Sequence, residues 1–150
     1  MTAPEDGTRP ATPMHLWIIG GVALLWNIMG PFDFTMTMTK SEWYLEQFTP
    51  QQMEYFLGFP TWVVVAWGVA VWFGFFGSVS LLRRRSQAVP LFLISFVAMV
   101  ITTIYNYVLT DGMEVMGTSG AIFAAVIFVV ALGLVMYSRA LAASGVLRRT

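Results

Sequence analysis

The sequence alternates four long apolar runs with short stretches that hold its charges and turn residues. The apolar runs cover residues 16–32, 61–82, 89–109 and 121–138. A helix of about 20 apolar residues crosses about 30 Å of hydrocarbon. Four buried core helices in 150 residues would leave too little polar surface to cover them. The pattern therefore predicts an all-α polytopic membrane protein, a bundle of four transmembrane helices.

Residues 33–60, between the first two runs, contain their own helix signals. Thr39-Lys40-Ser41-Glu42 has the spacing of a capping box, and Thr49-Pro50-Gln51-Gln52 places a hydroxyl at the N-cap, proline at N1 and glutamine at N3. Gly58 supplies a stop. We expect two short helices lying at the membrane interface, because aromatic residues crowd this loop: Trp43, Tyr44, Phe48, Tyr55, Phe56, Phe59 and Trp62.

The positive charges fall on one side of the predicted membrane. This side receives Arg9, Arg83, Arg84, Arg85, Arg139, Arg148 and Arg149. The other side receives Lys40 together with the carboxylates of Asp33, Glu42, Glu46, Glu54, Asp111 and Glu114. By the positive-inside rule, both termini should lie in the cytoplasm of a bacterium. We expect tails at residues 1–14 and 141–150 around a single inner-membrane domain at residues 15–140.

The composition narrows the chemistry. Hydrophobic residues make up 57% of the chain and charged residues 11%, so the lipid bilayer is its main partner. A net charge of zero argues against nucleic acid as a partner, and the absence of cysteine excludes disulfides and thiolate sites. The sequence contains no nucleophilic triad, phosphate loop or dinucleotide fingerprint. We therefore expect a protein that is not an enzyme and has no cofactor.

One polar construction stands out in the first run. Pro31 lacks an amide hydrogen, so the carbonyl of Asn27 loses its helical partner, and Gly30 beside the proline lets the backbone open at a kink. Asn27 would lie about 9 Å below Asp33 in a regular helix.

The third run repeats this pattern. Asn106 precedes Asp111 by five residues, about 7.5 Å, and Thr102, Thr103, Asn106 and Thr110 share one helical stripe. The two asparagines, each followed by an aspartate, predict a polar pocket in the outer leaflet for a neutral solute. The expected solute-binding residues are Trp26, Asn27, Asp33, Tyr105, Asn106 and Asp111, with Tyr107 as a further lining residue. The alternative is that Asn27 and Asn106 make hydrogen bonds that hold the helices together.

Small residues recur at every fourth position of the second run, namely Ala66, Ala70, Gly74 and Ser78. Such a stripe lets helix backbones approach closely, so we expect it at a helix contact. Trp62, Trp67 and Trp72 lie off this face. Large rings that point towards lipid or a partner would suit a structural accessory subunit of a larger membrane complex, or a homo-oligomer, and this is a second functional hypothesis.

Methionine offers a third hypothesis. Met36 and Met38, and likewise Met113 and Met116, are closely spaced on the predicted outer side, and clustered thioethers bind Cu(I). The alternative is that these methionines fill gaps between apolar helices.

Several segments resemble a known family. They are LLWNIMG at 24–30, FPTWVVVAWGVAVWFG at 59–74, GSVSLLRRRSQAVPLF at 77–92 and DGMEVMG at 111–117. The chain, over about residues 14–140, is similar to small, uncharacterised bacterial four-span membrane proteins that often carry the label of sugar transporter. The resemblance implies transport of a sugar-like solute, with Trp26 and Asn27 as the matching motif that would contact it.

Overall fold

The structure, a computed structural model, describes residues 10–149 and is built from helices. Residues 1–9, with the predicted tail charge Arg9, lie outside the described part, as does Thr150. The elements are α1 (Met14–Met38), α2 (Glu42–Leu45), α3 (Pro50–Leu57), α4 (Thr61–Leu82), α5 (Ala88–Ile104), the π-helical turn η1 (Tyr105–Leu109) and α6 (Gly112–Ala143). Four of these, with η1 continuing α5, are long and apolar enough to cross a membrane, which confirms the predicted four-helix architecture.

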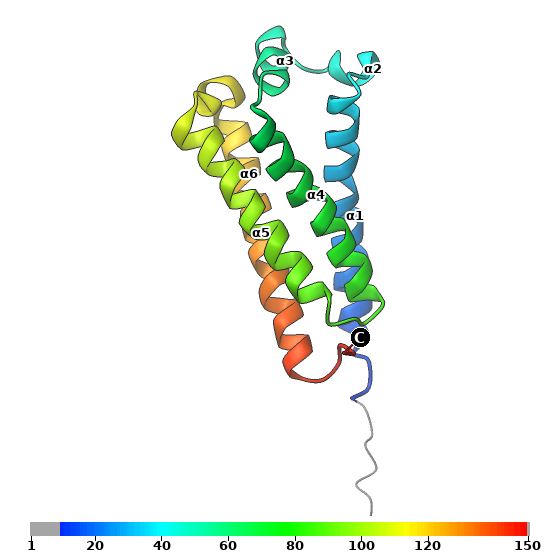
Figure 1. Cartoon of the computed structure of the whole chain (residues 1–150). Coiled ribbons are helices and arrows are strands. Elements are labelled where there is room, and N and C mark those ends of the chain that lie inside the picture. Colours follow the sequence, from blue (N-terminus) through cyan, green and yellow to red (C-terminus); the bar gives the residue numbers. More distant parts are fainter. Residues whose placement is uncertain (1–9, 150) are drawn as a thin grey trace, which may run out of the picture.

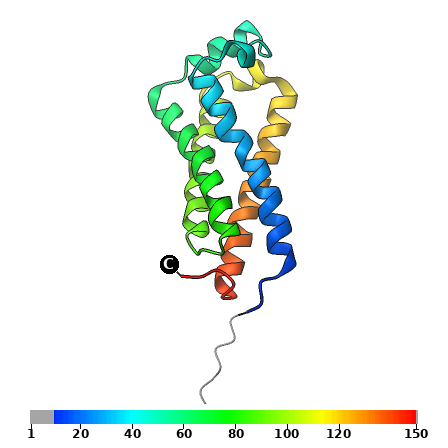
Figure 2. The ribbon, with the colours of Figure 1, turned by 90° about the vertical axis from the view of Figure 1, so that its right-hand side faces the viewer.

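The four long helices pack in sequence order, α1 against α4, α4 against α5 and α5 against α6. Figure 1 and Figure 2 show α2 and α3 at one end of the bundle, which we call the cap end. The first and last described residues, 10 and 149, lie at the opposite end, which we call the terminal end. The helices spread towards the cap end in Figure 1. α1 and α6 close the ring only loosely, since among the described residues their backbones approach closely at few positions.

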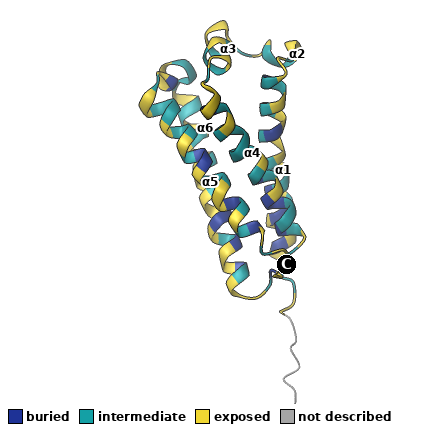
Figure 3. Ribbon diagram, viewed as in Figure 1, coloured by how far each residue is buried: buried dark blue, intermediate teal, exposed yellow. Residues whose placement is uncertain are grey.

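Tight packing is concentrated near the terminal end. The buried apolar cluster draws on α1, α4, α5, α6 and the C-terminal segment, with Leu16, Leu81, Phe92, Leu134 and Leu147 among its members. Figure 3 shows the buried residues gathered in this half of the bundle. Many large apolar side chains on the long helices are exposed instead, as expected for surfaces that contact lipid acyl chains.

The first and fourth helices are longer than their predicted apolar runs. α1 continues through Pro31 to Met38, so the proline does not end the helix at residue 32. α6 begins at Gly112 and ends at Ala143, with its only non-helical backbone at Gly117, where φ is 69°. Leu147 is 5% exposed, so part of the predicted C-terminal tail belongs to the packed core.

The loop between α1 and α4 contains both predicted short helices, but only one of the two predicted start signals is correct. Around α3, Gln52 N donates to Thr49 Oγ1 (3.2 Å) and Thr49 N donates to Gln52 Oε1 (3.1 Å), which completes the capping box, and Gly58 ends the helix. Thr39 caps no N-terminus. It ends α1, and its hydroxyl donates to Thr35 O (2.7 Å), because α1 extends to Met38 and leaves carbonyls there to be satisfied.

Candidate polar site at the cap end

Asn27 takes part in the contact between α1 and α4. Its Nδ2 donates to Ser78 Oγ (2.9 Å), and that hydroxyl donates to the carbonyl of Gly74 (3.1 Å). Ser78 is fully buried. A Cβ on Gly74 would lie 2.9 Å from Asn27 Oδ1, so the small residue is what allows the amide to fit against α4. Asn27 thus lies in a packed helix contact.

The two predicted asparagines lie at different depths. A Cβ on Gly74 would meet Ser95 Oγ of α5 (3.1 Å) as well as Asn27, so Asn27 lies level with Ser95. Asn106 follows Ser95 by eleven residues, which is about 16 Å along a helix. The expected similar depth is therefore wrong. It was counted from Asp33 as the end of the span, whereas α1 continues past this residue to Met38.

Asn106 belongs to a separate network at the cap end. The Tyr55 hydroxyl of α3 donates to Asn106 Oδ1 (2.8 Å) and lies 2.7 Å from Thr110 Oγ1. A Cβ on Gly112 would lie 2.1 Å from the carbonyl oxygen of Asn106 and 2.8 Å from Tyr55 Oη. The glycine therefore lets α3, the end of η1 and the start of α6 meet. We call Tyr55, Asn106 and Thr110 the cap network.

Only part of the predicted polar stripe enters this network. Thr102 and Thr103 both donate to the carbonyl of Met99 (2.8 Å each). Thr110 Oγ1 lies within hydrogen-bonding distance of the Tyr105 carbonyl (3.0 Å) and the Asn106 carbonyl (3.3 Å), which the wider turn leaves available. The i, i+3, i+4 rule holds for 3.6 residues per turn, and η1 departs from that period.

Aromatic rings surround the cap network. Tyr105 contacts Phe59 (5.5 Å between ring centroids) and Trp62 (5.4 Å), and Phe59 contacts Tyr55 (5.2 Å), all edge to face. Further edge-to-face contacts join Phe48 to Phe56 between the two short helices. The predicted aromatic belt is thus a connected cluster that attaches α3 to α4 and η1.

A second hydrogen bond attaches α2. Tyr44 Oη donates to Asp33 Oδ1 of α1 (2.5 Å), and the Phe32 ring packs edge to face on Tyr44 at 5.6 Å. Burial and the neighbouring carboxylate raise the pKa of Tyr44 above its usual range, so the phenol stays a donor. Burial likewise raises the pKa of Tyr55. Asp111, by contrast, is exposed and makes no side-chain cap on α6.

The predicted pocket residues are therefore distributed over several places. Trp26 points to α6, where its ring lies 6.1 Å from Phe123, while its neighbour Asn27 contacts α4. Tyr105, Asn106 and Asp111 lie at the cap end. Asp33 accepts a hydrogen bond from Tyr44 of α2. Gly30 lies against Val71 of α4, where a Cβ would approach to 2.9 Å.

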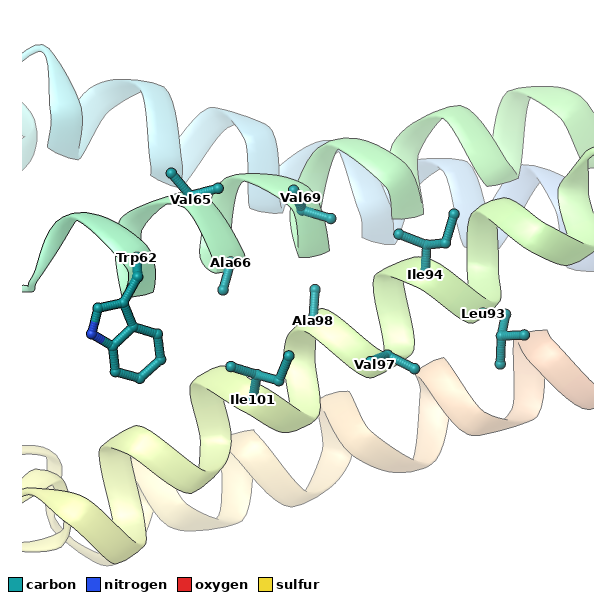
Figure 4. A pocket seen from close by; sticks show the side chains of 9 residues that line it. All are labelled: Trp62, Val65, Ala66, Val69, Leu93, Ile94, Val97, Ala98 and Ile101. Atoms are coloured by element: carbon teal, nitrogen blue, oxygen red, sulfur yellow. The ribbon is translucent and has the colours of Figure 1, made fainter.

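Apolar cavities lie along the described helices, and two of them are considered in turn. One, of about 540 Å³, lies between α4 and α5 and is lined by Ala66, Ala98, Trp62 and neighbouring aliphatic residues (Figure 4). The other, of about 420 Å³, lies between α1 and α6. Neither contains Asn27 or Asn106 in its lining.

The small-residue stripe of α4 lies where neighbouring helices approach. Ser95 Oγ of α5 donates to the Ala70 carbonyl (2.6 Å), Gly74 and Ser78 contact Asn27, and Ala66 lines the cavity shared with α5. We expect Trp67 to point towards lipid or a partner, but its ring packs on Phe34 of α1, with the ring centroids 5.0 Å apart.

The methionine pairs lie on the last turns of α1 (Met36, Met38) and on the first turns of α6 (Met113, Met116). Within residues 10–149 no three histidine or acidic side chains gather as a metal site. Cu(I) binding by the two methionine pairs stays a prediction.

Sequence reasoning missed the partners of both asparagines. Tyr55 was assigned only to the aromatic belt and Ser78 only to the packing stripe. The completed capping box at Thr49 placed Tyr55 on a helix, but its contact with Asn106 depends on packing between residues 51 apart. Comparisons of the chain with protein-family models, with curated proteins and with solved structures find no match.

Proposed function

We propose that this chain is a small, non-enzymatic integral membrane protein that binds a neutral polar solute, such as a sugar, at the cap network. The observation that supports the proposal is the hydrogen-bonded set formed by Tyr55 of α3 with Asn106 on the π-helical turn η1 and Thr110 at its end. Single π-helical turns occur frequently at functional sites.

The chemistry of the cap network suits an uncharged ligand. Its side chains are two hydroxyls and an amide, and the raised pKa of Tyr55 keeps the phenol neutral. Asn106 accepts through Oδ1, and its Nδ2 hydrogens donate to no other described residue. Neutral donors and acceptors beside aromatic rings bind ligand hydroxyls without the cost of desolvating a charge.

The arginine distribution supports an orientation for this site. Six arginines lie in the α4–α5 loop, on α6 or after it, towards the terminal end. If that end faces the cytoplasm of a bacterial inner membrane, the cap network opens to the outside. A solute would then reach it without crossing the bilayer.

The test is uptake or binding of neutral mono- and disaccharides by the purified protein in lipid vesicles. Tyr55→Phe removes only the hydroxyl, and we expect it to lower solute affinity about tenfold because one hydrogen-bonding group of the half-buried site is lost. Tyr107→Phe is the matched control, since Tyr107 lies on η1 but outside the cap network. No binding by the wild type, or equal affinity in Tyr55→Phe, would contradict the proposal.

An accessory-subunit role is the second candidate, supported by one exposed aromatic group on α4. Trp72 (38% exposed) stacks on Phe76 (48% exposed) with ring centroids 6.0 Å apart. If this face docks on a larger complex or on another copy, Trp72→Ala with Phe76→Ala should release the chain on a native gel after mild extraction. Val65→Ala, also on an exposed part of α4, should not. Co-migration that survives the double substitution would count against this role.

A further inference from the structure

At the terminal end, backbone hydrogen bonds hold two arginine-bearing segments together. Arg148 N donates to the Arg84 carbonyl (2.6 Å), and Ser86 N donates to the Arg148 carbonyl (2.9 Å). The resulting single β-bridge pairs Arg85 with Arg148. Like charges repel, so a backbone arrangement that gathers arginines favours an anionic ligand at this end.

Arg84 also reaches the start of α1. Its guanidinium donates to Thr12 Oγ1, three residues before His15. His15 Nδ1 lies 2.6 Å from the Tyr137 hydroxyl of α6. Arg139, two residues after Tyr137, lies on the opposite face of this helix. The described carboxylates lie elsewhere, on the cap side of the chain, at Asp33, Glu42, Glu46, Glu54, Asp111 and Glu114. Glu5 and Asp6 lie outside the described residues.

An apolar groove leads away from this basic end. It runs between α1 and α6, has a volume of about 420 Å³ and is lined by Ile18, Ile19, Val22, Ala23, Trp26, Val130, Gly133, Leu134 and Tyr137. Residues 18 to 26 of α1 extend about 12 Å along the helix. The groove has the His15–Tyr137 pair at its basic end and Trp26, which contacts Phe123, at the other.

Gly133 leaves the groove open. A Cβ at this position would meet nothing within 4 Å, although the residue lies in the middle of α6. α1 and α6 also approach each other less closely than the sequence-adjacent long helices do. The space between them therefore has room for a flexible apolar chain that the protein itself does not fill.

We propose that the α1–α6 groove binds one acyl chain of an anionic phospholipid whose phosphate is held by the arginines of the two paired segments at the terminal end. The wholly aliphatic and aromatic groove fits the chain, and the arginine cluster fits the phosphate by charge. The phospholipid then fills the loosest contact of the bundle, between its first and last helices. This site is separate from the cap network and does not depend on the proposed solute.

The experiment is native mass spectrometry of the delipidated full chain, titrated with phosphatidylglycerol and with phosphatidylcholine of identical acyl chains. We expect one phosphatidylglycerol per chain, bound at least about fivefold more tightly than phosphatidylcholine, from the gain for one basic residue near an anionic head group. Arg84→Gln should reduce this preference while leaving phosphatidylcholine binding and the circular dichroism spectrum unchanged. Arg139→Gln removes the same charge on the face of α6 opposite Tyr137, so it is the matched control and should leave the preference unchanged.

A matched glycine pair tests the groove itself. Gly133→Leu fills the space and should lower the binding of both lipids at least about fivefold, whereas Gly21→Leu adds the same side chain at an open position outside the groove and should not. Equal effects of the two variants, equal affinity for the two lipids, or displacement of the lipid by millimolar inorganic phosphate would overturn the proposal. The proposal would also be overturned if the wild type were a dimer that Gly133→Leu dissociates, because a second copy of the chain would then occupy the groove.

Discussion

At the residue scale, the cap end is held together by hydrogen bonds of tyrosine and threonine hydroxyl groups. Tyr44 donates to Asp33, Tyr55 to Asn106, and Thr110 lies between Tyr55 and the carbonyls of η1. Deeper in the bundle, Asn27 and Ser95 both contact the small-residue face of α4. Each of these polar groups is paired within the protein, which a lipid environment requires.

Because Gly74 lies in a tight contact, adding a single methyl group there should lower the stability of the bundle. A Cβ there would lie 2.9 Å from Asn27 Oδ1 and 3.1 Å from Ser95 Oγ, so Gly74→Ala should destabilise the bundle by about 1–3 kcal/mol. Gly133→Ala, where a Cβ has open space, should be neutral or slightly stabilising. Unfolding in a denaturing detergent measures both. Equal stability of the two variants would contradict the described approach of α1 and α5 to α4.

Tyr44 predicts a pH dependence at the alkaline end. Its folded pKa lies above the ordinary value of 10.0, so the added stability is fully present below pH 10 and is lost as pH rises beyond it. The absorbance of phenolate in the wild type minus that in Tyr44→Phe should therefore titrate above pH 10. A difference curve centred at or below 10 would show that Tyr44 is not held against Asp33.

At the element scale, local sequence signals predicted features made by residues close together in the chain. The end of α1 and the partners of the two asparagines depend on long-range packing and were not predicted. The capping box at Thr49 was correct because it is made by residues three apart. The signal at Thr39 was wrong because α1 continued past Pro31, and the ends of apolar runs do not fix where a helix ends. Nothing in Tyr-Asn-Tyr-Val-Leu marks a π-helical turn, so the contacts of Thr110 with the carbonyls of η1 could not be foreseen.

The packing of α3 against the end of η1 should weaken when Thr110 is replaced. Thr110→Val removes the partner of Tyr55 and the hydroxyl beside the carbonyls of η1, so α3 should open more often. If the free energy needed to open α3 falls by about 1.4 kcal/mol, amide hydrogen exchange in residues 50–57 becomes about tenfold faster. Exchange in α4 should stay unchanged. An equal increase in both helices would mean that the substitution loosens the whole bundle instead.

At the scale of the whole molecule, the bundle has two unlike ends joined by surfaces suited to lipid. The terminal end has the tight core and the arginine segments, and the cap end has the aromatic cluster and the cap network. Four spans could be predicted because hydropathy is a local property of sequence. The shared pocket of Asn27 and Asn106 could not be judged in the same way, because relative depth depends on how α1 and α5 are staggered against α4.

The proposed function depends most directly on whether the cap end faces outward and the terminal end inward. The chain has no cysteine, so single exposed positions can be labelled without background. Gln47→Cys, between α2 and α3, and Ser144→Cys, after α6, report on the two ends. In intact cells a membrane-impermeant thiol reagent should label Gln47→Cys alone, and Ser144→Cys only after lysis. Labelling of Ser144→Cys in intact cells, or of both positions from one side, would contradict the account.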